Sequence, residues 1–575
     1  MKYLLLFAIT PVQSFIAQSR KVRDLTAGSR MLSDLIEESI NFLNAKEVIN
    51  PDEDIVFPFK GLKDKPNRLL TYITTEDPQQ IGEDLEEYIK KYFLDKARET
   101  LTKYYKTNLD YAIDQLRDLL KIYWVIIPAS DNYAYDHQKI ERLLGGIKNL
   151  RAFDQFAEKG RKCAINGEYN VTIFKGKDNY KPHWLTYTKN VEIKNQIEHS
   201  LLSEGEALST INFYKRVYPL KENKYNATCE IAYMDAIAEL SDVQKEIEAL
   251  KKIDEQYLYK DAHVKKGDDF SKVKRLRSPI NKELKNKEIK LSKYYAVLVF
   301  DADNLGKWLS GEYLINKEND LLYFQQQLSK QFGEFADYAS EYVNGNKNNV
   351  IQKGQAVYAG GDDFLGLINL KYLFDVLKEL NCQFRNIVWN KLSKDDKIHF
   401  KDKVAPMTFS AGVAIAHYKT PLSFVLTEAR KAEKTAKDKA NRNSVAITVL
   451  KRSGEIHQSY FKWMDNSDTY LPDDLAAIIS ALNTKVSSNK FITSFTKLFL
   501  PVIKEGHIGI DDQLIKSELS RLLKDNKVEN IEENTITLFN HFYSDKGRLE
   551  DFIYLLNIAD FIGREINSPH NPLKQ

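Results

Sequence analysis

The sequence predicts an α+β protein with two ferredoxin-like (βαββαβ) palm domains, the second catalytic, a mostly helical inter-palm domain and a C-terminal helical bundle. Three observations predict this fold class. Apolar runs at residues 3–9 and 294–300 each open an α/β stretch, a Gly-Gly-Asp-Asp sequence separates two strand-like runs, and residues after 460 show only helical periodicity. A chain of 575 residues has room for three or four domains.

The first palm is expected over residues 1–160. Its opening run is short and is followed by Pro11 and Gln13, so we interpret it as a buried strand and not as a signal peptide or membrane span. Its other predicted elements are a helical stretch at 13–42, a strand at 69–74, a long amphipathic helix at 82–120 and a strand at 123–127.

The inter-palm domain is expected over residues 161–290. It begins with loop-like segments and becomes helical and charged from residue 231. Residues 265–290 are lysine-rich with few apolar side chains, and we interpret them as a solvated linker in preference to a nucleic-acid site.

The second palm is expected over residues 291–455 and the helical bundle over residues 456–575. The predicted palm elements are a strand at 296–300, a helix from 303, the Gly-Gly hairpin, a strand at 407–416, a helix at 421–439 and a strand at 444–449. The bundle helices are predicted at 471–482, 491–503, 513–523 and 549–566, an arrangement typical of a docking module or a lid.

Composition excludes some classes of function. The net charge of +3 does not indicate a nucleic-acid binder by bulk electrostatics, although local patches stay open. The three cysteines are far apart and form no disulfide framework, which fits a reducing, cytoplasmic location.

The most informative tract is residues 356–367, which is expected to form a strand, a tight turn and a strand. Gly360 and Gly361 permit the turn and leave room for a ligand beside the backbone. Asp362 and Asp363 lie at its tip, and Asp301 follows the apolar run at 294–300. Palm-type nucleotidyl transferases bring such an acid-tipped strand and hairpin together to hold two divalent metals on a triphosphate.

Attack on the α-phosphate of a nucleotide builds negative charge, which two Mg²⁺ (or Mn²⁺) ions would stabilise while they align the displacement. We therefore predict Asp301, Asp362 and Asp363 as catalytic and metal-binding residues, with the carbonyl of Ala302 as a further ligand. The alternative is an ordinary β-turn whose aspartates face solvent.

Phosphate contacts are predicted first at a helix that begins near Asn304 and is capped by Asp303. The amides of Leu305, Gly306 and Lys307 would then face the β- and γ-phosphates.

A second set of phosphate contacts is predicted from the helix at 421–439. Lys437, and Arg442 after it, are the candidates. Lys431 and Lys434 are interpreted instead as a solvated face with helix-spaced pairs to Glu428 and Glu433.

These motifs resemble the large subunit of type III-B CRISPR–Cas (Cmr) effector complexes. Residues 294–311 and 356–367 look like that family's second palm, with Ser410-Ala411-Gly412-Val413-Ala414-Ile415-Ala416-His417 and Arg442-Asn443 in the expected order. Four further segments resemble that family's first palm: Ile9-Thr10-Pro11-Val12-Gln13-Ser14-Phe15-Ile16, Arg20-Lys21-Val22-Arg23-Asp24-Leu25, Gly28-Ser29 and Pro66-Asn67-Arg68. The resemblance runs to about residue 455 and is weaker through the helical regions.

The resemblance implies a ribonucleoprotein subunit that works with a CRISPR RNA and other Cmr proteins and is switched on by target RNA. Its palm would convert ATP into a cyclic oligoadenylate messenger, and Ser410 would join the nucleotide-binding residues.

The sequence departs from the family pattern in two places. The chain starts at the first palm strand and contains no His-Asp dipeptide, so we predict no HD-type DNA cleavage. Where relatives carry a four-cysteine zinc site, this chain has Cys163, Asn166, Ser209 and Asn212, so we predict no zinc.

Other functions fit parts of this pattern. A diguanylate cyclase shares the palm, but here the motif ends Asp-Asp-Phe and no Arg-x-x-Asp precedes the hairpin. A template-dependent polymerase and a silent scaffold of the ribonucleoprotein are further alternatives. Within the enzyme class, the palm could transfer AMP from ATP to another acceptor such as S-adenosylmethionine. The acceptor pocket is expected in the first palm near Gln13, Ser14, Gly28 and Ser29.

Overall fold

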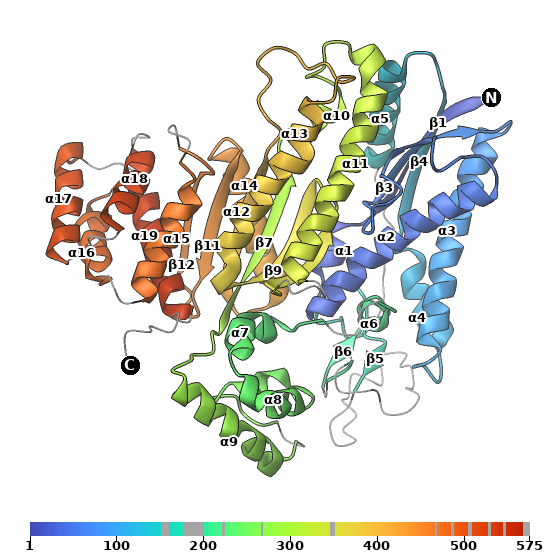
Figure 1. Cartoon of the computed structure of the whole chain (residues 1–575). Coiled ribbons are helices and arrows are strands. Elements are labelled where there is room, and N and C mark those ends of the chain that lie inside the picture. The colour runs from blue at the N-terminus through green and yellow to red at the C-terminus, as the bar shows by residue number, and fades with distance from the viewer. Residues whose placement is uncertain are drawn as a thin grey trace.

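The computed structural model describes residues 1–150, 160–175, 197, 201–203, 205–220, 225–265, 268–345, 351–465, 469–484, 488–503, 509–526, 531–543 and 548–566. Two β-sheets occupy the centre and right of Figure 1, with the helices of residues 210–286 below them and those of residues 471–565 on the left. No helix in the described ranges is long and apolar enough to cross a bilayer.

The first sheet has the ferredoxin-like connectivity expected of a palm. Its strands are β1 (Lys2–Thr10), β2 (Ile55–Phe57), β3 (Arg68–Thr74) and β4 (Lys121–Pro128), in the order β2-β3-β1-β4. β1 is central and antiparallel to both β3 and β4. Residues 4–9 are buried without alternation, because the strand is covered on both faces, and this explains their unbroken apolar run.

The helices of the first palm differ from the prediction in where they break. They are α1 (Gln13–Ala17), α2 (Val22–Ala45), α3 (Pro78–Leu101), α4 (Leu109–Arg117) and α5 (Tyr133–Asn149). The predicted helices at 13–42 and 82–120 are each two helices, and α5 was not predicted. Asn108 starts α4 from a left-handed conformation (φ 55°), which asparagine tolerates, so the second break has a local cause that hydrophobic periodicity does not reveal.

The second sheet contains the same four-strand unit and two additional strands. Its strands are β7 (Tyr294–Ala302), β8 (Gly354–Ala359), β9 (Asp363–Asn369), β10 (Phe409–His417), β11 (Ser444–Leu450) and β12 (Ile456–Lys462). They lie in the order β12-β11-β10-β7-β9-β8, so β10-β7-β9-β8 repeats the order of the first palm.

Two details of the second palm correct the prediction. The connecting helices of its four-strand unit are α11 (Lys317–Asn344) and α12 (Leu373–Gln383), and α12 was missed. The predicted helix at 421–439 is α14 (Leu422–Asp438), which instead joins β10 to the parallel strand β11. β12 pairs with β11, so the sheet continues beyond residue 455 into a region predicted as helical.

α14 packs closely on β10 at Gly412. A Cβ atom at this position would lie 2.2 Å from the carbonyl oxygen of Ala429 and 2.2 Å from the amide nitrogen of Glu433. Glycine is therefore required there, and its small size brings the charged turns of α14 next to the end of β7.

The region between the palms is partly helical, with α6 (Thr210–Val217), α7 (Thr228–Ala238), α8 (Gln244–Lys251) and α9 (Phe270–Asn286). The lysine-rich stretch predicted as a linker is mostly α9, which buries Val273 and Ile280; residues 266 and 267 lie outside the described residues. This helix agrees with the helical character expected from residue 231, because Val273, Leu276, Ile280 and Leu284 recur every three or four positions on one side.

The C-terminal region is helical after β12. Its helices are α15 (Leu471–Asn483), α16 (Lys490–Phe499), α17 (Asp512–Asp525), α18 (Glu532–Tyr543) and α19 (Leu549–Glu565), of which α18 was not predicted. α15 packs against α12 and α19 against β12, so the bundle is joined to the second palm. The proposed domain boundaries at residues 160 and 290 stay predictions.

Candidate active site

Asp301 and Asp363 lie directly opposite each other on the adjacent antiparallel strands β7 and β9. Side chains alternate along a strand, and Asp301 shares its face with Val297 and Val299, while Asp363 shares its face with Leu365 and Leu367. This is the face of the sheet that α14 covers. The strand register therefore brings the two carboxylates together, as the sequence motif predicts.

The hairpin between β8 and β9 forms as expected and depends on its glycines. Gly361 has a φ of 96°, and a Cβ there would lie 2.4 Å from the Phe332 carbonyl oxygen. A Cβ on Gly360 would lie 2.5 Å from Oδ1 of Asp363. The backbone carbonyl of Asp362 accepts a 2.7 Å hydrogen bond from the amide of Ala302, which ties the turn to the end of β7.

The three carboxylates interact unfavourably. Burial, followed by the negative charge of Asp301, raises the pKa of Asp362 to about 7. Burial and the charges of Asp362 and Asp301 raise the pKa of Asp363 well above its usual range. Oδ1 of Asp363 is buried and has no hydrogen-bond partner among the described residues. Such a group of carboxylates gains from an added cation.

A cation is already supplied by α14. The ammonium of Lys437 contacts Oδ2 of Asp301 and lies 2.8 Å from Oε1 of Glu433. Burial opposes the charge on Lys437, but the two carboxylates outweigh it and raise its pKa. Lys431 is exposed and pairs with Glu428 at 2.7 Å, as predicted, but the Glu428 side chain is largely buried.

A cavity of about 540 Å³ joins this acidic end to the first palm. From the second palm it is lined by Asp301, Asp362 and Asp363 and by the α14 residues Arg430, Glu433, Lys434, Lys437 and Asp438. From the first palm it is lined by Val12, Gln13, Ile16, Ser29, Leu32, Lys65, Pro66 and Asn67. The two walls therefore come from two different α/β units.

The predicted nucleotide-binding residues divide between this cavity and its surroundings. Gln13, Ser29 and Lys437 line it. The remaining predicted residues are not part of its lining: Ser14, Gly28, Ala302, Asn304, Leu305, Gly306, Lys307, Gly360, Gly361, Ser410 and Arg442.

Several lining residues were missed by sequence reasoning. Arg430 and Lys434 lie one helical turn apart on α14, and this spacing could have placed both beside Lys437. Asn67 belongs to the motif Pro66-Asn67-Arg68 and Lys65 directly precedes it, but neither was predicted as a site residue.

Asp303 does not cap the helix that follows it. Its carboxylate accepts hydrogen bonds of 2.8 Å from Thr408 Oγ1, 2.8 Å from Ser410 Oγ and 2.9 Å from the amide of Asn443. Ser410 is fully buried and its hydroxyl is used in this contact, so Ser410 supports the strand ends from outside the cavity.

The helix near Asn304 is also shorter than the phosphate prediction required. α10 (Leu305–Leu309) has five residues, and the amide of Lys307 donates to the carbonyl of Asn304. The side chain of Lys307 pairs with Glu312 at 3.2 Å.

The donor atoms suit Mg²⁺, but the described residues do not form a ready-made metal centre. No group of three or more His, Cys, Asp or Glu side chains in the described part of the chain is arranged to hold a metal ion. The cross-strand pair of Asp301 and Asp363, and the unpartnered Oδ1 of Asp363, fit a hard cation. Binding would require Lys437 to release Asp301, and the predicted ligand set therefore stays a proposal.

The structure brings together the four residues that stand where relatives carry a four-cysteine site: Cys163, Asn166, Ser209 and Asn212. Nδ2 of Asn212 lies 3.4 Å from Sγ of Cys163 and 3.2 Å from Oγ of Ser209, and Nδ2 of Asn166 lies 3.4 Å from the same hydroxyl. Hydrogen bonds link all four side chains. The absence of zinc stays a prediction.

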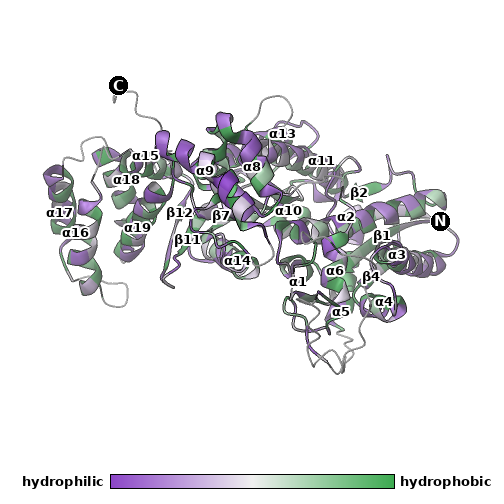
Figure 2. Cartoon of the chain, turned by 90° about the horizontal axis from the view of Figure 1, so that it is seen from below, coloured by the Kyte–Doolittle hydropathy of each residue, from purple (hydrophilic) through white to green (hydrophobic). Residues whose placement is uncertain are grey.

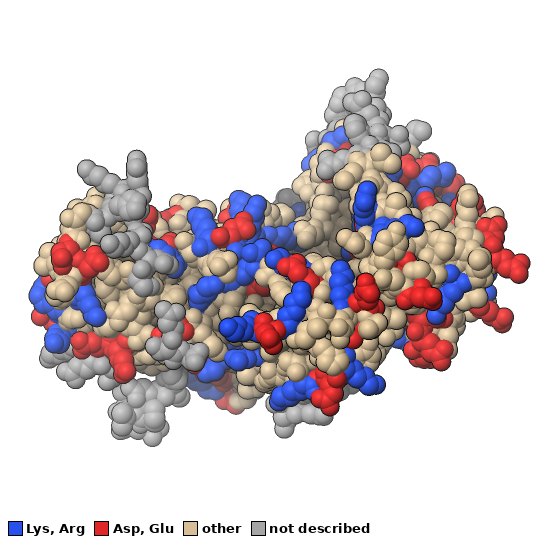
Figure 3. Space-filling model, turned by 90° about the horizontal axis from the view of Figure 1, so that it is seen from above, with Lys and Arg blue, Asp and Glu red and all other residues tan. Residues whose placement is uncertain are grey.

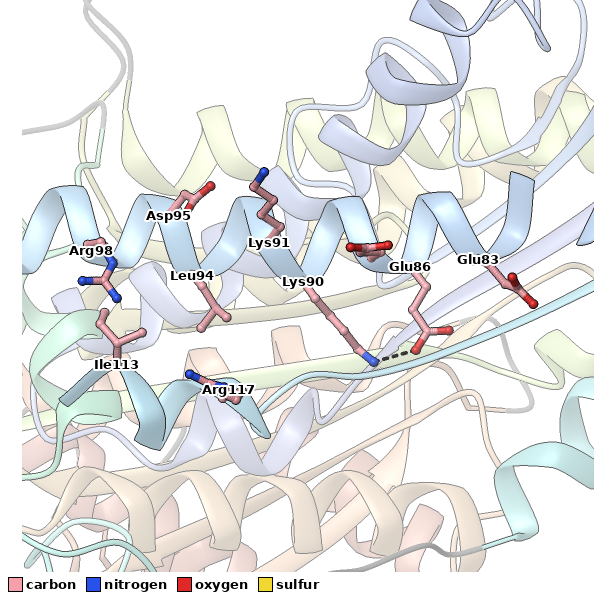
Figure 4. Close-up of a pocket in the computed structure, with 10 residues that line it drawn as sticks. Glu83, Glu86, Lys90, Lys91, Leu94, Asp95, Arg98, Ile113 and Arg117 are labelled. Carbon is pink, nitrogen blue, oxygen red and sulfur yellow. Dashed lines mark hydrogen bonds and ion pairs between the residues drawn. The ribbon is translucent and has the colours of Figure 1, made fainter. Parts of the chain in front are cut away.

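A second cavity, of about 580 Å³, lies on the first palm between α3 and α4 (Figure 4). Its lining mixes acidic and basic side chains, and Lys90 pairs with Glu86 within it at 2.6 Å. None of the predicted catalytic residues lines it.

Comparisons with known proteins agree with this architecture. The family model described as Cas10/Cmr2, second palm domain, matches residues 294–446, and the model described as CRISPR-associated protein Cmr2, N-terminal, matches residues 4–93. The CRISPR system Cmr subunit Cmr2 of Pyrococcus furiosus is 24% identical over 80% of this chain, and the match spans 63% of that protein's length.

Two solved structures share the fold. The type III-B Cmr-beta structure in the apo state has a TM-score of 0.62 and 14% identity, covering 98% of this chain and 82% of that chain. The type III-B Cmr-beta structure bound to cognate target RNA has a TM-score of 0.65 and 14% identity, covering 98% and 83%. The two family models thus cover residues 4–93 and 294–446, and these parts of the chain are similar to Cas10/Cmr2 proteins.

Proposed function

We propose that this chain is an ATP-dependent nucleotidyltransferase and the large subunit of a type III-B, CRISPR RNA-guided Cmr complex. On binding of target RNA it would make a cyclic oligoadenylate. The observation that carries the proposal is the cavity between the palms, which brings Asp301 and the Asp362–Asp363 turn next to the basic residues of α14. Its volume is in the range of small-molecule sites.

Each wall has a separate part in the proposed reaction. The three aspartates would hold divalent cations, which when bound stabilise the charge that develops on the reacting phosphate. Arg430, Lys434 and Lys437 would neutralise the triphosphate of the donor ATP. On the opposite wall, Gln13, Ser29 and Asn67 present polar groups that could orient the acceptor.

The double variant Asp362→Ala/Asp363→Ala tests the enzyme proposal in the assembled, target-bound complex. We expect loss of the nucleotide product with normal assembly, because the hairpin keeps both glycines. A matched control is Asp52→Ala/Asp110→Ala, which removes two largely exposed aspartates of the first palm. Unchanged ATP turnover in the hairpin variant would exclude these carboxylates, and absence of product from every complex would favour the scaffold role.

The acceptor is a separate question, because the two walls differ. The first-palm wall includes the apolar residues Ile16, Leu32 and Pro66 and does not repeat the acidic set. AMP transfer to another acceptor, such as S-adenosylmethionine, would use the same donor wall. Mass spectrometry of products made from ATP, with and without S-adenosylmethionine, separates this outcome from a cyclic oligoadenylate.

A further inference from the structure

Helix α9 in the inter-palm region is strongly two-sided. At 100° per residue, four cationic side chains and two serines fall within one arc of about 100°. All six residues are exposed: Ser271, Lys274, Arg275, Ser278, Lys282 and Lys285. The opposite side buries Val273 and Ile280 against the core, with Leu276 and Leu284 packed beside them. The helix is therefore fixed in rotation, and its cations face outward.

The exposed arc contains no acidic residue. Glu283 is the only acidic residue of α9, and it lies toward the packed side and pairs with Lys287 at 3.2 Å. Arg277 is also used internally, since its guanidinium donates to the carbonyls of Tyr257, Lys260 and Ala262. The cations on the arc, Lys274, Arg275, Lys282 and Lys285, are called the α9 basic face below.

Three basic residues of α3 are paired with acidic neighbours. On α3, Lys90 pairs with Glu86 at 2.6 Å, Lys96 with Glu99 at 3.4 Å and Arg98 with Asp110 at 2.8 Å. Figure 3 shows acidic and basic side chains interspersed over the upper face of the molecule. Within the described part of the chain, the α9 basic face makes no ion pair. Its charge is therefore not balanced locally, although the whole chain carries only +3.

The shape of this surface suits an extended polyanion. Lys274 and Lys285 are eleven positions apart, which corresponds to about 16 Å along the helix axis. The face is convex, and α9 contributes no residue to either cavity described above. Phe270 is 64% exposed at the start of the helix, about 40° beyond Lys274 around the axis. Cations beside an exposed aromatic ring are the combination that holds single-stranded nucleic acid, by phosphate neutralisation and base stacking.

We propose that the α9 basic face, together with Phe270, binds single-stranded RNA. The choice of RNA rests on the proposed function as part of an RNA-guided complex. α9 lies toward the viewer in Figure 2, and most of the ribbon that it shows there is hydrophilic.

The test measures the affinity of the purified full chain for a fluorescein-labelled single-stranded RNA, by anisotropy over a series of salt concentrations and without nucleotide. The test variant is Arg275→Gln/Lys282→Gln/Lys285→Gln. The matched control is Lys90→Gln/Lys96→Gln/Arg98→Gln on α3, which removes the same three charges. We expect at least a tenfold loss of affinity for the α9 variant and less than twofold for the control. The slope of log K against log salt should fall by about 2, which is about 0.7 for each lost phosphate contact.

Equal losses in the two variants would show that only net charge matters and would overturn the proposal, as would wild-type binding by the α9 variant. Poly-glutamate that competes as well as unlabelled RNA would indicate an acidic protein as the partner instead. Phe270→Ala should weaken binding without changing the salt slope, because stacking releases no counterions. Asp362→Ala/Asp363→Ala should bind RNA normally, so failure of the proposed chemistry and failure of this proposal give different results.

Discussion

Gly412→Ala provides a strong test of how α14 is held against the second sheet. The added Cβ would lie 2.2 Å from two backbone atoms of α14, and 2.8 Å from the Cα of Glu433. Ordinary contacts begin near 3.4 Å, so the helix must move by roughly 1.2 Å. β10 cannot move instead, because it pairs with β7 on one side and with β11 on the other.

Overpacking of a core by one methyl group costs about 1–3 kcal/mol, and two backbone contacts place this case at about 3 kcal/mol. Hydrogen exchange of the peptides that cover β10 and α14 measures this locally, without assuming that the whole chain unfolds in one step. The expected change is about a hundredfold faster exchange. ATP turnover should fall as well, since a displaced α14 withdraws Lys437 from the acidic end of the cavity.

The control is Gly145→Ala, in the C-terminal part of α5, where an added Cβ has no neighbour within 4 Å. Alanine is favoured over glycine in a helix, so this variant should be unchanged or stabilised by about 0.5–1 kcal/mol. Exchange in Gly412→Ala within threefold of the wild type would refute the close-packing argument.

Three further predictions follow from buried polar contacts. Lys437→Met should lower ATP turnover at least tenfold. It should also tighten Mn²⁺ binding by the nucleotide-free chain, measured by electron paramagnetic resonance, because Asp301 loses a competing cation. Unchanged Mn²⁺ binding would contradict this. Asp303→Ala should destabilise the second palm by about 3 kcal/mol in urea unfolding, because three hydrogen-bond donors lose their acceptor, and a loss below 1 kcal/mol would argue against that role. Burial lowers the pKa of Lys215 to about 7 in the folded chain, so the unfolded chain binds more protons between pH 7 and 10. The free energy of unfolding of the wild type should therefore rise over that pH range. The rise should be smaller in Lys215→Met, and equal slopes of unfolding free energy against pH in the two proteins would refute the prediction.

The β-strands and the acidic hairpin were predictable because their signals are local. β7 and β10 are covered on both faces and are apolar at almost every position, and Gly360-Gly361 marks the turn between two such runs. α5 and α12 were missed, although α12 buries apolar residues at helical spacing: Leu373, Val376, Leu377 and Leu380. The breaks after α1 and α3 were also missed, because single residues such as Asn108 determine them.

The site was most predictable in the part that strand register defines. Asp301 and Asp363 could be paired from the order of the motifs, since Asp301 lies at the end of one apolar strand and Asp363 at the start of another. The role of Asp303 could not be predicted, because its hydrogen-bond partners lie more than a hundred positions further along the chain. On the first-palm wall, Gln13 and Ser29 were predicted, whereas Lys65 and Asn67 were not, since they approach the cavity through packing between the two palms.

The acidic site is positioned by apolar residues and not by the acids themselves. The carboxylates repel one another, so they would separate if β7 and β9 could slide. A shift of one residue would exchange the side chains of the two buried faces, and the loss of close packing on both faces would exceed any electrostatic relief. Register is thus enforced by the buried faces of the sheet, Gly412 sets the distance to α14, and Lys437 meets Asp301 as a result. Substitutions in this apolar framework, far from any phosphate, are therefore expected to reduce activity by moving charges that they do not contact.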